Sequence, residues 1–198
     1  CVDGKLVPMQ ICIDTLNQLY DLDLDENSMH EWIDEHKEDI DEVNSSEDVV
    51  LKNAGRDIYD KLFNNYTEKQ WGTSAANLSP SVISRIPFRF NHDTRYFDDP
   101  YQGMPKEGFT KMCENMIKSD KIHVGLKADY KDYIHRINYA KLIYTGPIDY
   151  FYDYKYGELL YRCLNFVYEI LDEDSYQEVG VVNYPTHPYF TRITEFKN

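Results

Sequence analysis

Residues 66–109 read YTEKQWGTSAANLSPSVISRIPFRFNHDTRYFDDPYQGMPKEGF, and they hold more aromatic, arginine, proline and glycine residues than a plain core needs. The segment YTEKQW favours a helix that ends at a Gly-Thr-Ser turn, and a second short helix brings Arg85 to a stop at Pro87. The irregular segment that follows presents Tyr96, Phe97 and Tyr101. Aromatic rings beside guanidinium groups suit a ligand that joins a flat ring to phosphate, because rings stack and arginine binds phosphate oxygens bidentately. For any single residue, a structural role in a packed loop is the competing interpretation.

The first ninety residues have the patterns of a small helical domain. An acidic block at 21–48 contains thirteen Asp or Glu residues and one basic residue, Lys37. Its apolar and aromatic positions recur at the spacing of one helix face: Met29, Trp32, Ile33 and His36. We predict a helix capped by Asn27 or Ser28 whose charges lie in solvent. The alternative is that the stripe with Trp32 faces a partner.

Three other helix starts are predicted in this domain. Asp14 is the expected cap of an early helix, Ser45 or Ser46 begins a later one, and Ser79, which precedes a proline, begins a short one. Residues 1–90 are therefore predicted to form a helical domain.

Beyond residue 108 the pattern mixes helix and strand. Apolar residues at helical spacing predict one more helix: Phe109, Met112, Cys113, Met116 and Ile117. Two apolar strands are expected at 122–126 and 141–146, and alternation with period two from 159 onward, through GVVNY and YFTRITEF, favours an antiparallel sheet. We predict a mixed α/β fold, in which 91–148 is a connecting loop, a helix and two strands returning to a nucleotide-binding sheet. Residues 149–198 would form part of an antiparallel sheet domain.

Composition narrows the possible functions. A net charge of −14 opposes a nucleic-acid partner, because such a partner requires a basic face. The four cysteines and six histidines show no metal-ligand spacing, and reduced cytosolic thiols are the preferred interpretation. No apolar run approaches the length of roughly 18 residues that a membrane span needs. We expect a cytoplasmic protein without metal, membrane or nucleic-acid partners.

Seven segments, together with the opening 4–20, resemble the UDP-galactopyranose mutase family in order and spacing. They are YTEKQWG (66–72), SRIPFRF (84–90), DTRYFDDPYQGMPKEGFT (93–110), YTGPID (144–149), LLYRCLNF (159–166), VVNYP (181–185) and YFTRITEFKN (189–198). The resemblance implies a flavoenzyme that interconverts UDP-galactopyranose and UDP-galactofuranose and supplies galactofuranose for bacterial surface glycans. It also implies a homodimer for the whole enzyme.

The same resemblance implies a set of residues that bind UDP or UDP-galactose. By this resemblance, Tyr66 stacks on the uracil and Thr67 lies beside Tyr66. Trp71 belongs to a mobile loop that closes over the nucleotide. Two arginines clamp the diphosphate, and a tyrosine donates to a phosphate oxygen. The full expected set is Phe63, Tyr66, Thr67, Trp71, Arg85, Tyr96, Asn183 and Arg192. For the arginines, a salt bridge to Asp93 or Glu195 is the alternative. Arg162 matches a family position without an assigned role, and Cys12 stands where many members carry an asparagine near the ligand.

For FAD, the resemblance assigns Val124, Thr145 and Gly146 to backbone positions near the cofactor. The family's glycine-rich dinucleotide loop is missing from the nine glycines, so we expect an internal section of the enzyme with an incomplete flavin site. No side chain stands out as catalytic, because the family's chemistry proceeds through a covalent adduct between flavin N5 and the sugar. The section alone is expected to be inactive.

Two alternatives remain open from the sequence. The first is a flavin-dependent relative that acts on another sugar nucleotide. The second is a non-catalytic, acidic helical domain that binds a partner through its aromatic surface.

Overall fold

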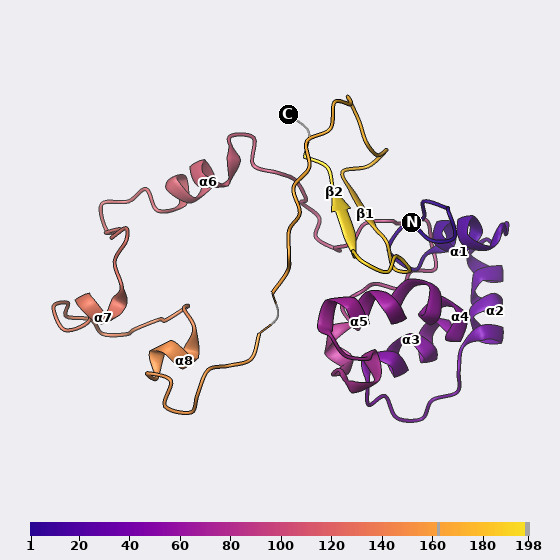
Figure 1. Cartoon of the computed structure of the whole chain (residues 1–198), viewed down its shortest axis with the longest axis horizontal. Helices are drawn as coiled ribbons and strands as arrows, with labels where there is room; N and C mark the ends of the chain where they lie inside the picture. Colours follow the sequence, from indigo (N-terminus) through magenta and orange to yellow (C-terminus); the bar gives the residue numbers. More distant parts are fainter. Residues whose placement is uncertain (162, 197–198) are drawn as a thin grey trace. The chain divides into compact units, whose positions relative to one another are not determined.

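The structure, a computed structural model, describes residues 1–161 and 163–196 (Figure 1). The chain divides into two compact units, one made of Cys1–Asp98 with Asn165–Asn198 and the other of Asp99–Leu164. The described part is mostly helical and contains one two-stranded antiparallel sheet. None of its helices is long and apolar enough to cross a membrane. The domain boundaries predicted at 90/91 and 148/149 stay predictions.

Three helices open the first unit: α1 (Ile13–Tyr20), α2 (Glu26–His36) and α3 (Ser46–Ala54). Ser45 caps α3 in a reciprocal capping box with Asp48, as predicted. The predicted cap of α2 was wrong, because Asp25 accepts from the backbone of Ser28 and the helix begins two or three residues earlier than expected. Asp14 was also wrong as a cap. It lies inside the first turn of α1 and pairs with His92 instead.

A longer helical stretch follows Gly55 and positions most of the site. It consists of α4 (Arg56–Ile58), a wider π-helical turn at Tyr59–Asn64, and α5 (Asn65–Trp71). The stretch ends where Gly72 adopts a left-handed conformation with φ 65°. Such π turns inside helices recur at functional sites.

The core of this unit lies among α1 to α4 and the π turn. Met29 and Ile33 of α2 are 1% and 5% exposed, and Trp32 packs partly against the same core. The apolar stripe of the acidic helix therefore faces inward, and its charges lie on the outside. This finding removes the structural argument for a partner surface on that stripe.

Two short 3₁₀ turns and a bridge lead from the helices to the irregular segment. The turns are Ala75–Asn77 and Pro80–Val82, and Ser79 caps the second one as predicted. The segment then pairs with the beginning of α1, since Ile11 forms a parallel bridge with Phe88 and the Ile11 carbonyl accepts from the Arg89 amide at 2.8 Å.

The sheet of the first unit is a short hairpin of β1 (Val181–Asn183) and β2 (Arg192–Thr194). Its register pairs Val181 with Thr194 and Asn183 with Arg192. The antiparallel strands predicted within GVVNY and YFTRITEF are thus present. Because Asn183 ends one strand and Arg192 begins the next, the two side chains lie at the same end of the hairpin.

The second unit contains α6 (Gly108–Met116), α7 (Tyr130–Tyr133) and α8 (Ile148–Phe151). The strands predicted at 122–126 and 141–146 were wrong, because both ranges are irregular. The described residues of 159–171 are irregular as well, and Arg162 lies outside the described residues. A strand requires a neighbour for its backbone N–H and C=O groups. None of these three segments has one among the described residues.

Candidate functional site

A cavity of the first unit has a volume of about 720 Å³. Pockets for small organic ligands occupy about 300–1,000 Å³. The helical stretch, the segment after the 3₁₀ turns and the hairpin all contribute to the wall. The eight residues predicted to bind substrate all line this one cavity: Phe63, Tyr66, Thr67, Trp71, Arg85, Tyr96, Asn183 and Arg192.

The π turn and α5 form the aromatic side of the cavity. Phe63 and Thr67 are each 5% exposed, so they form a fixed floor. Tyr66 is half-buried, and its hydroxyl oxygen accepts hydrogen bonds from Gln70 Nε2 at 3.0 Å and from Arg192 Nη2 at 3.1 Å. The Tyr66 hydroxyl is therefore bonded both to its own helix, through Gln70, and to the hairpin, through Arg192.

Trp71 is the last residue of α5 and remains 37% exposed. Gly72 follows with a positive φ, a conformation that glycine adopts at little cost. An exposed indole at a helix end beside such a glycine can change its position without disturbing the core. The geometry is compatible with the predicted closing loop, which stays a prediction.

The hairpin supplies a guanidinium whose orientation is fixed by neutral groups. Arg192 Nε donates to Asn183 Oδ1 at 2.8 Å, and its Nη2 donates to Tyr66. No acceptor pairs with its Nη1 among the described residues, and Arg192 lines the cavity. A guanidinium held by neutral acceptors keeps its positive charge uncompensated, which favours an anionic ligand.

Arg85 also lines the cavity, from an exposed turn that follows buried Ile83. Among the described residues, no carboxylate pairs with Arg85 or Arg192. The carboxylates proposed as alternative partners are engaged elsewhere. Asp93 binds Arg95, and Glu195 accepts from the backbone amide of Gln177 at 3.0 Å.

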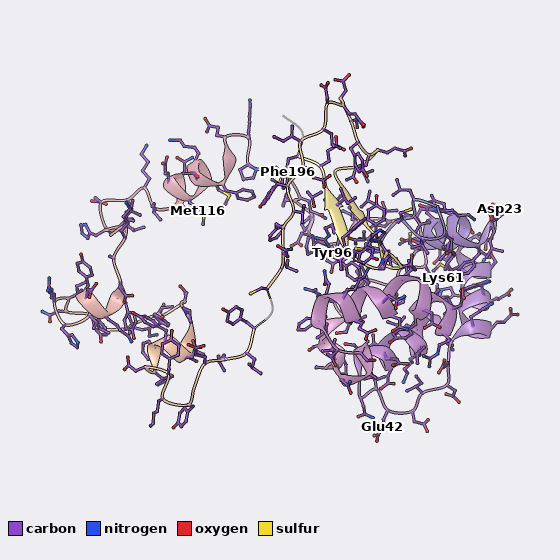
Figure 2. The ribbon with its side chains drawn as sticks, viewed as in Figure 1. Asp23, Glu42, Lys61, Tyr96, Met116 and Phe196 are labelled. Carbon is purple, nitrogen blue, oxygen red and sulfur yellow. The ribbon has the colours of Figure 1, made fainter. Side chains whose placement is uncertain are left out.

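Tyr96, labelled in Figure 2, is half-buried and completes the polar side of the wall. Its ring meets that of Phe97 edge to face at a centroid distance of 4.9 Å. The chain around it is fixed by Asp93, which accepts from the backbone and side chain of Arg95. This ion pair strongly lowers the pKa of Asp93.

Gln70 is a wall residue that the sequence analysis missed. It lies four positions after Tyr66 on the same helix, a spacing that brings side chains together, so the signal was available. Cys12 shows the opposite. It is fully buried, its sulfur lies 3.3 Å from Thr15 Oγ1, and it does not belong to the cavity wall.

The residues assigned to FAD lie in the second unit and do not fit a flavin as they stand. Val124 is 54% exposed in an irregular stretch. Thr145 and Gly146 border a separate hollow of about 370 Å³. A Cβ atom at Gly146 would lie 2.4 Å from Tyr144 Oη, so the tyrosine ring already fills the space where a ligand would approach the glycine backbone. The described residues also contain no group of three or more His, Cys, Asp or Glu side chains placed to hold a metal ion.

The helical scaffold and the aromatic, cationic cavity define a class, a small-molecule-binding domain suited to an anionic ligand that contains a flat ring. Comparison with known proteins gives the family. A profile of the UDP-galactopyranose mutase family matches residues 61–198, and this chain belongs to that family.

Individual relatives agree in family and differ in substrate name. The chain is 36% identical over 199 residues to a probable UDP-galactopyranose mutase of Klebsiella pneumoniae, covering 99% of this chain and 51% of that protein. It is 33% identical over 202 residues to a dTDP-fucopyranose mutase of Escherichia coli, covering 98% and 53%. A UDP-galactopyranose mutase of Mycoplasma pneumoniae is 30% identical over 149 residues, covering 69% and 37%. The chain thus spans about half the length, or less, of these curated relatives.

Proposed function

We propose that this chain carries the substrate pocket of a UDP-galactopyranose mutase, an enzyme that interconverts UDP-galactopyranose and UDP-galactofuranose. The observation that carries the proposal is the convergence of the eight expected residues on one cavity of suitable volume. Residues that lie up to 129 positions apart, from Phe63 to Arg192, meet there, and family membership supports the same interpretation.

Each wall of the cavity has a task in this proposal. Tyr66 stacks on the uracil ring, and two hydrogen bonds at its hydroxyl hold the tyrosine ring in place for this. Arg85 and Arg192, which come from different elements, both bind the diphosphate, and Tyr96 donates a hydrogen bond to a phosphate oxygen. The chain's part in the reaction is to hold the nucleotide and orient the sugar. FAD belongs to the proposal for the whole enzyme only, and Val124, Thr145 and Gly146, which do not fit a flavin as they stand, have no role in it.

A second candidate is dTDP-fucopyranose as the substrate, favoured by the nearly equal identity to the Escherichia coli mutase. Both candidates are pyrimidine nucleoside diphosphates joined to a hexose. The ring-stacking and diphosphate contacts would serve either of them. Competition between UDP-galactose and dTDP-fucose for the cavity would rank the two.

Calorimetric titration of the full 198-residue chain with UDP tests the proposal. Arg85→Ala and Arg192→Ala should each weaken binding by about ten- to a hundredfold, since each loses a charge-assisted contact. Arg→Lys at either position should recover the charge but only part of the affinity. Tyr66→Ala should weaken UDP more than inorganic pyrophosphate, because it removes the stacking ring together with one of the two acceptors that orient Arg192.

The control is Arg136→Ala, which removes an exposed arginine of the second unit that borders neither cavity. Its UDP affinity should equal that of the parent chain. Unchanged affinity in both pocket arginine variants, with native circular dichroism, would return Arg85 and Arg192 to ordinary surface residues. Loss of binding in the control as well would point to a general charge effect.

A further inference from the structure

Lys69 makes an unusual set of contacts outside the cavity wall. It lies on α5 between Thr67 and Trp71. Its ammonium donates to three backbone carbonyl oxygens, those of Tyr184 at 2.9 Å, His187 at 2.6 Å and Phe190 at 3.0 Å. An ammonium has three N–H donors, so its capacity is fully used.

The charge of Lys69 is held by neutral acceptors alone. Among the described residues, no carboxylate pairs with it, and the side chain is partly buried. Burial lowers the pKa of the ammonium. In a chain with 35 acidic residues, a lysine placed for simple charge neutralisation would have found a carboxylate. We therefore interpret the three carbonyl contacts of Lys69 as contacts that hold the backbone in place.

The three carbonyls belong to the connection between β1 and β2. This connection is ordered within itself, because His187 stacks on Phe190 at 3.7 Å and the Tyr184 amide donates to the Thr191 carbonyl. The two strands form only three residue pairs, and a two-stranded hairpin of this size is marginally stable in water. The position of the β1–β2 hairpin against α5 therefore depends on contacts with residues outside the hairpin.

We propose that Lys69 is a positioning residue of the substrate pocket: it ties the β1–β2 connection to α5 and so sets Arg192 and Asn183 against Tyr66. The inference rests on the proposed function. Lys69 reaches the ligand through the hairpin, as it does not line the cavity. The helix that carries Tyr66 and the hairpin that carries Arg192 then behave as one rigid wall.

The test is Lys69→Met, which keeps an unbranched side chain only one heavy atom shorter and removes all three donors. Lys52→Met is the matched control, since Lys52 also donates to a carbonyl, that of Ile40 at 2.8 Å, but on α3 and away from the cavity. We expect Lys69→Met to weaken UDP binding about tenfold, a typical size for coupling within one network, and Lys52→Met to leave it unchanged.

A double-mutant cycle separates positioning from general damage. Lys69→Met combined with Arg192→Ala should bind UDP about as weakly as Arg192→Ala alone, because both changes remove the same contact. Combined with Arg85→Ala, its effect should multiply. Equal multiplication in both combinations, or unchanged affinity in Lys69→Met, would overturn the proposal.

Amide hydrogen exchange gives a readout that does not require UDP. In Lys69→Met, the amides of Val182 and Ile193 should exchange faster, while those of the helical core should stay as protected as in the parent. Unchanged hairpin exchange would overturn the inference even if UDP binds. Failure of the parent chain to bind UDP would contradict the proposed function and leave this exchange result to decide on Lys69. If Lys69→Met does not fold, Lys69→Gln, which keeps two donors, should show an intermediate increase.

Discussion

Gly55 shows how one residue sets the angle between two helices of the first unit. It ends α3 and precedes α4 with φ +84°, a conformation that L side chains rarely adopt. A Cβ atom at this position would lie 2.0 Å from the backbone oxygen of His36 at the end of α2. The backbones of three helices therefore meet at a point where only a hydrogen atom fits.

Gly55→Ala should lower the free energy of unfolding by about 2–4 kcal/mol, from backbone strain together with the clash against a main-chain atom. Gly103→Ala is the control, because a Cβ atom there meets nothing within 4 Å. Urea unfolding followed by circular dichroism measures both. A loss of similar size in the two variants would contradict this account of Gly55.

At the scale of elements, the segment that carries Tyr96 is fixed by an ionic cluster. The Asp93 carboxylate accepts hydrogen bonds from the backbone amide and the guanidinium of Arg95. It also pairs with Arg89, which in turn pairs with Asp98. These contacts hold the pKa of the Asp93 carboxyl well below its usual range, with Arg95 as the main cause.

This shift predicts an acid dependence of stability with a definite sign. The folded-state pKa of Asp93 is lower than its unfolded value of about 3.9, so its contribution is complete above that value and is lost as pH falls through the lower, folded one. The melting temperature of the parent should therefore exceed that of Asp93→Asn by a constant amount above about pH 5, and this difference should shrink progressively as pH falls below about 4. Thermal unfolding across pH 2–7 measures this, and a difference in melting temperature that is as large at pH 2 as at pH 7 would contradict it.

The elements also show which structure the sequence could predict. Ser45, Ser79 and the stripe of Met29 and Ile33 are local signals, and the helices they mark are present. The apolar runs at 122–126 and 141–146 predicted strands that the structure lacks. A strand forms only when a second segment pairs with it, and a local sequence pattern does not show whether such a partner is present. The π turn had no signal at all, since its wider spacing depends on how the helix packs.

The same limit applied to the site. The eight residues expected from the family resemblance could be named, and the structure places them around one cavity. Gln70 had a helical-spacing signal that was overlooked. Lys69 had none, because its partners are main-chain oxygens, which every residue carries and no sequence pattern distinguishes.

At the scale of the whole chain, burial is distributed unequally between the two units. Every residue of the described core belongs to the first unit, and none of the described residues of 99–164 is buried. Several large apolar side chains of the second unit are mostly exposed, among them Met104 and Leu126. Segments with so little buried surface open at low free-energy cost.

Limited trypsin digestion of the 198-residue chain should therefore cut first within 99–164, at sites such as Lys111 and Lys121. The lysines of the helical core, such as Lys61, should be cut much later, and mass spectrometry of the fragments gives the order. Addition of UDP should slow cleavage in the first unit only, because the cavity lies there. Early cleavage at Lys61 would contradict the unequal distribution of stability.

The π turn at Tyr59–Asn64 sets the direction in which the aromatic wall of the pocket faces. A π turn accommodates one residue more than the regular helix, and each residue of an α-helix advances the direction of its side chain by about 100°. The turn therefore offsets the direction of every later side chain of the helical stretch by about that angle. Without it, Ile58 would keep its place in the core while Tyr66 would rotate by about 100° around the axis, away from Arg192. The π turn rotates α5 about its axis, and this rotation, rather than the type of side chain, directs Tyr66 toward the pocket.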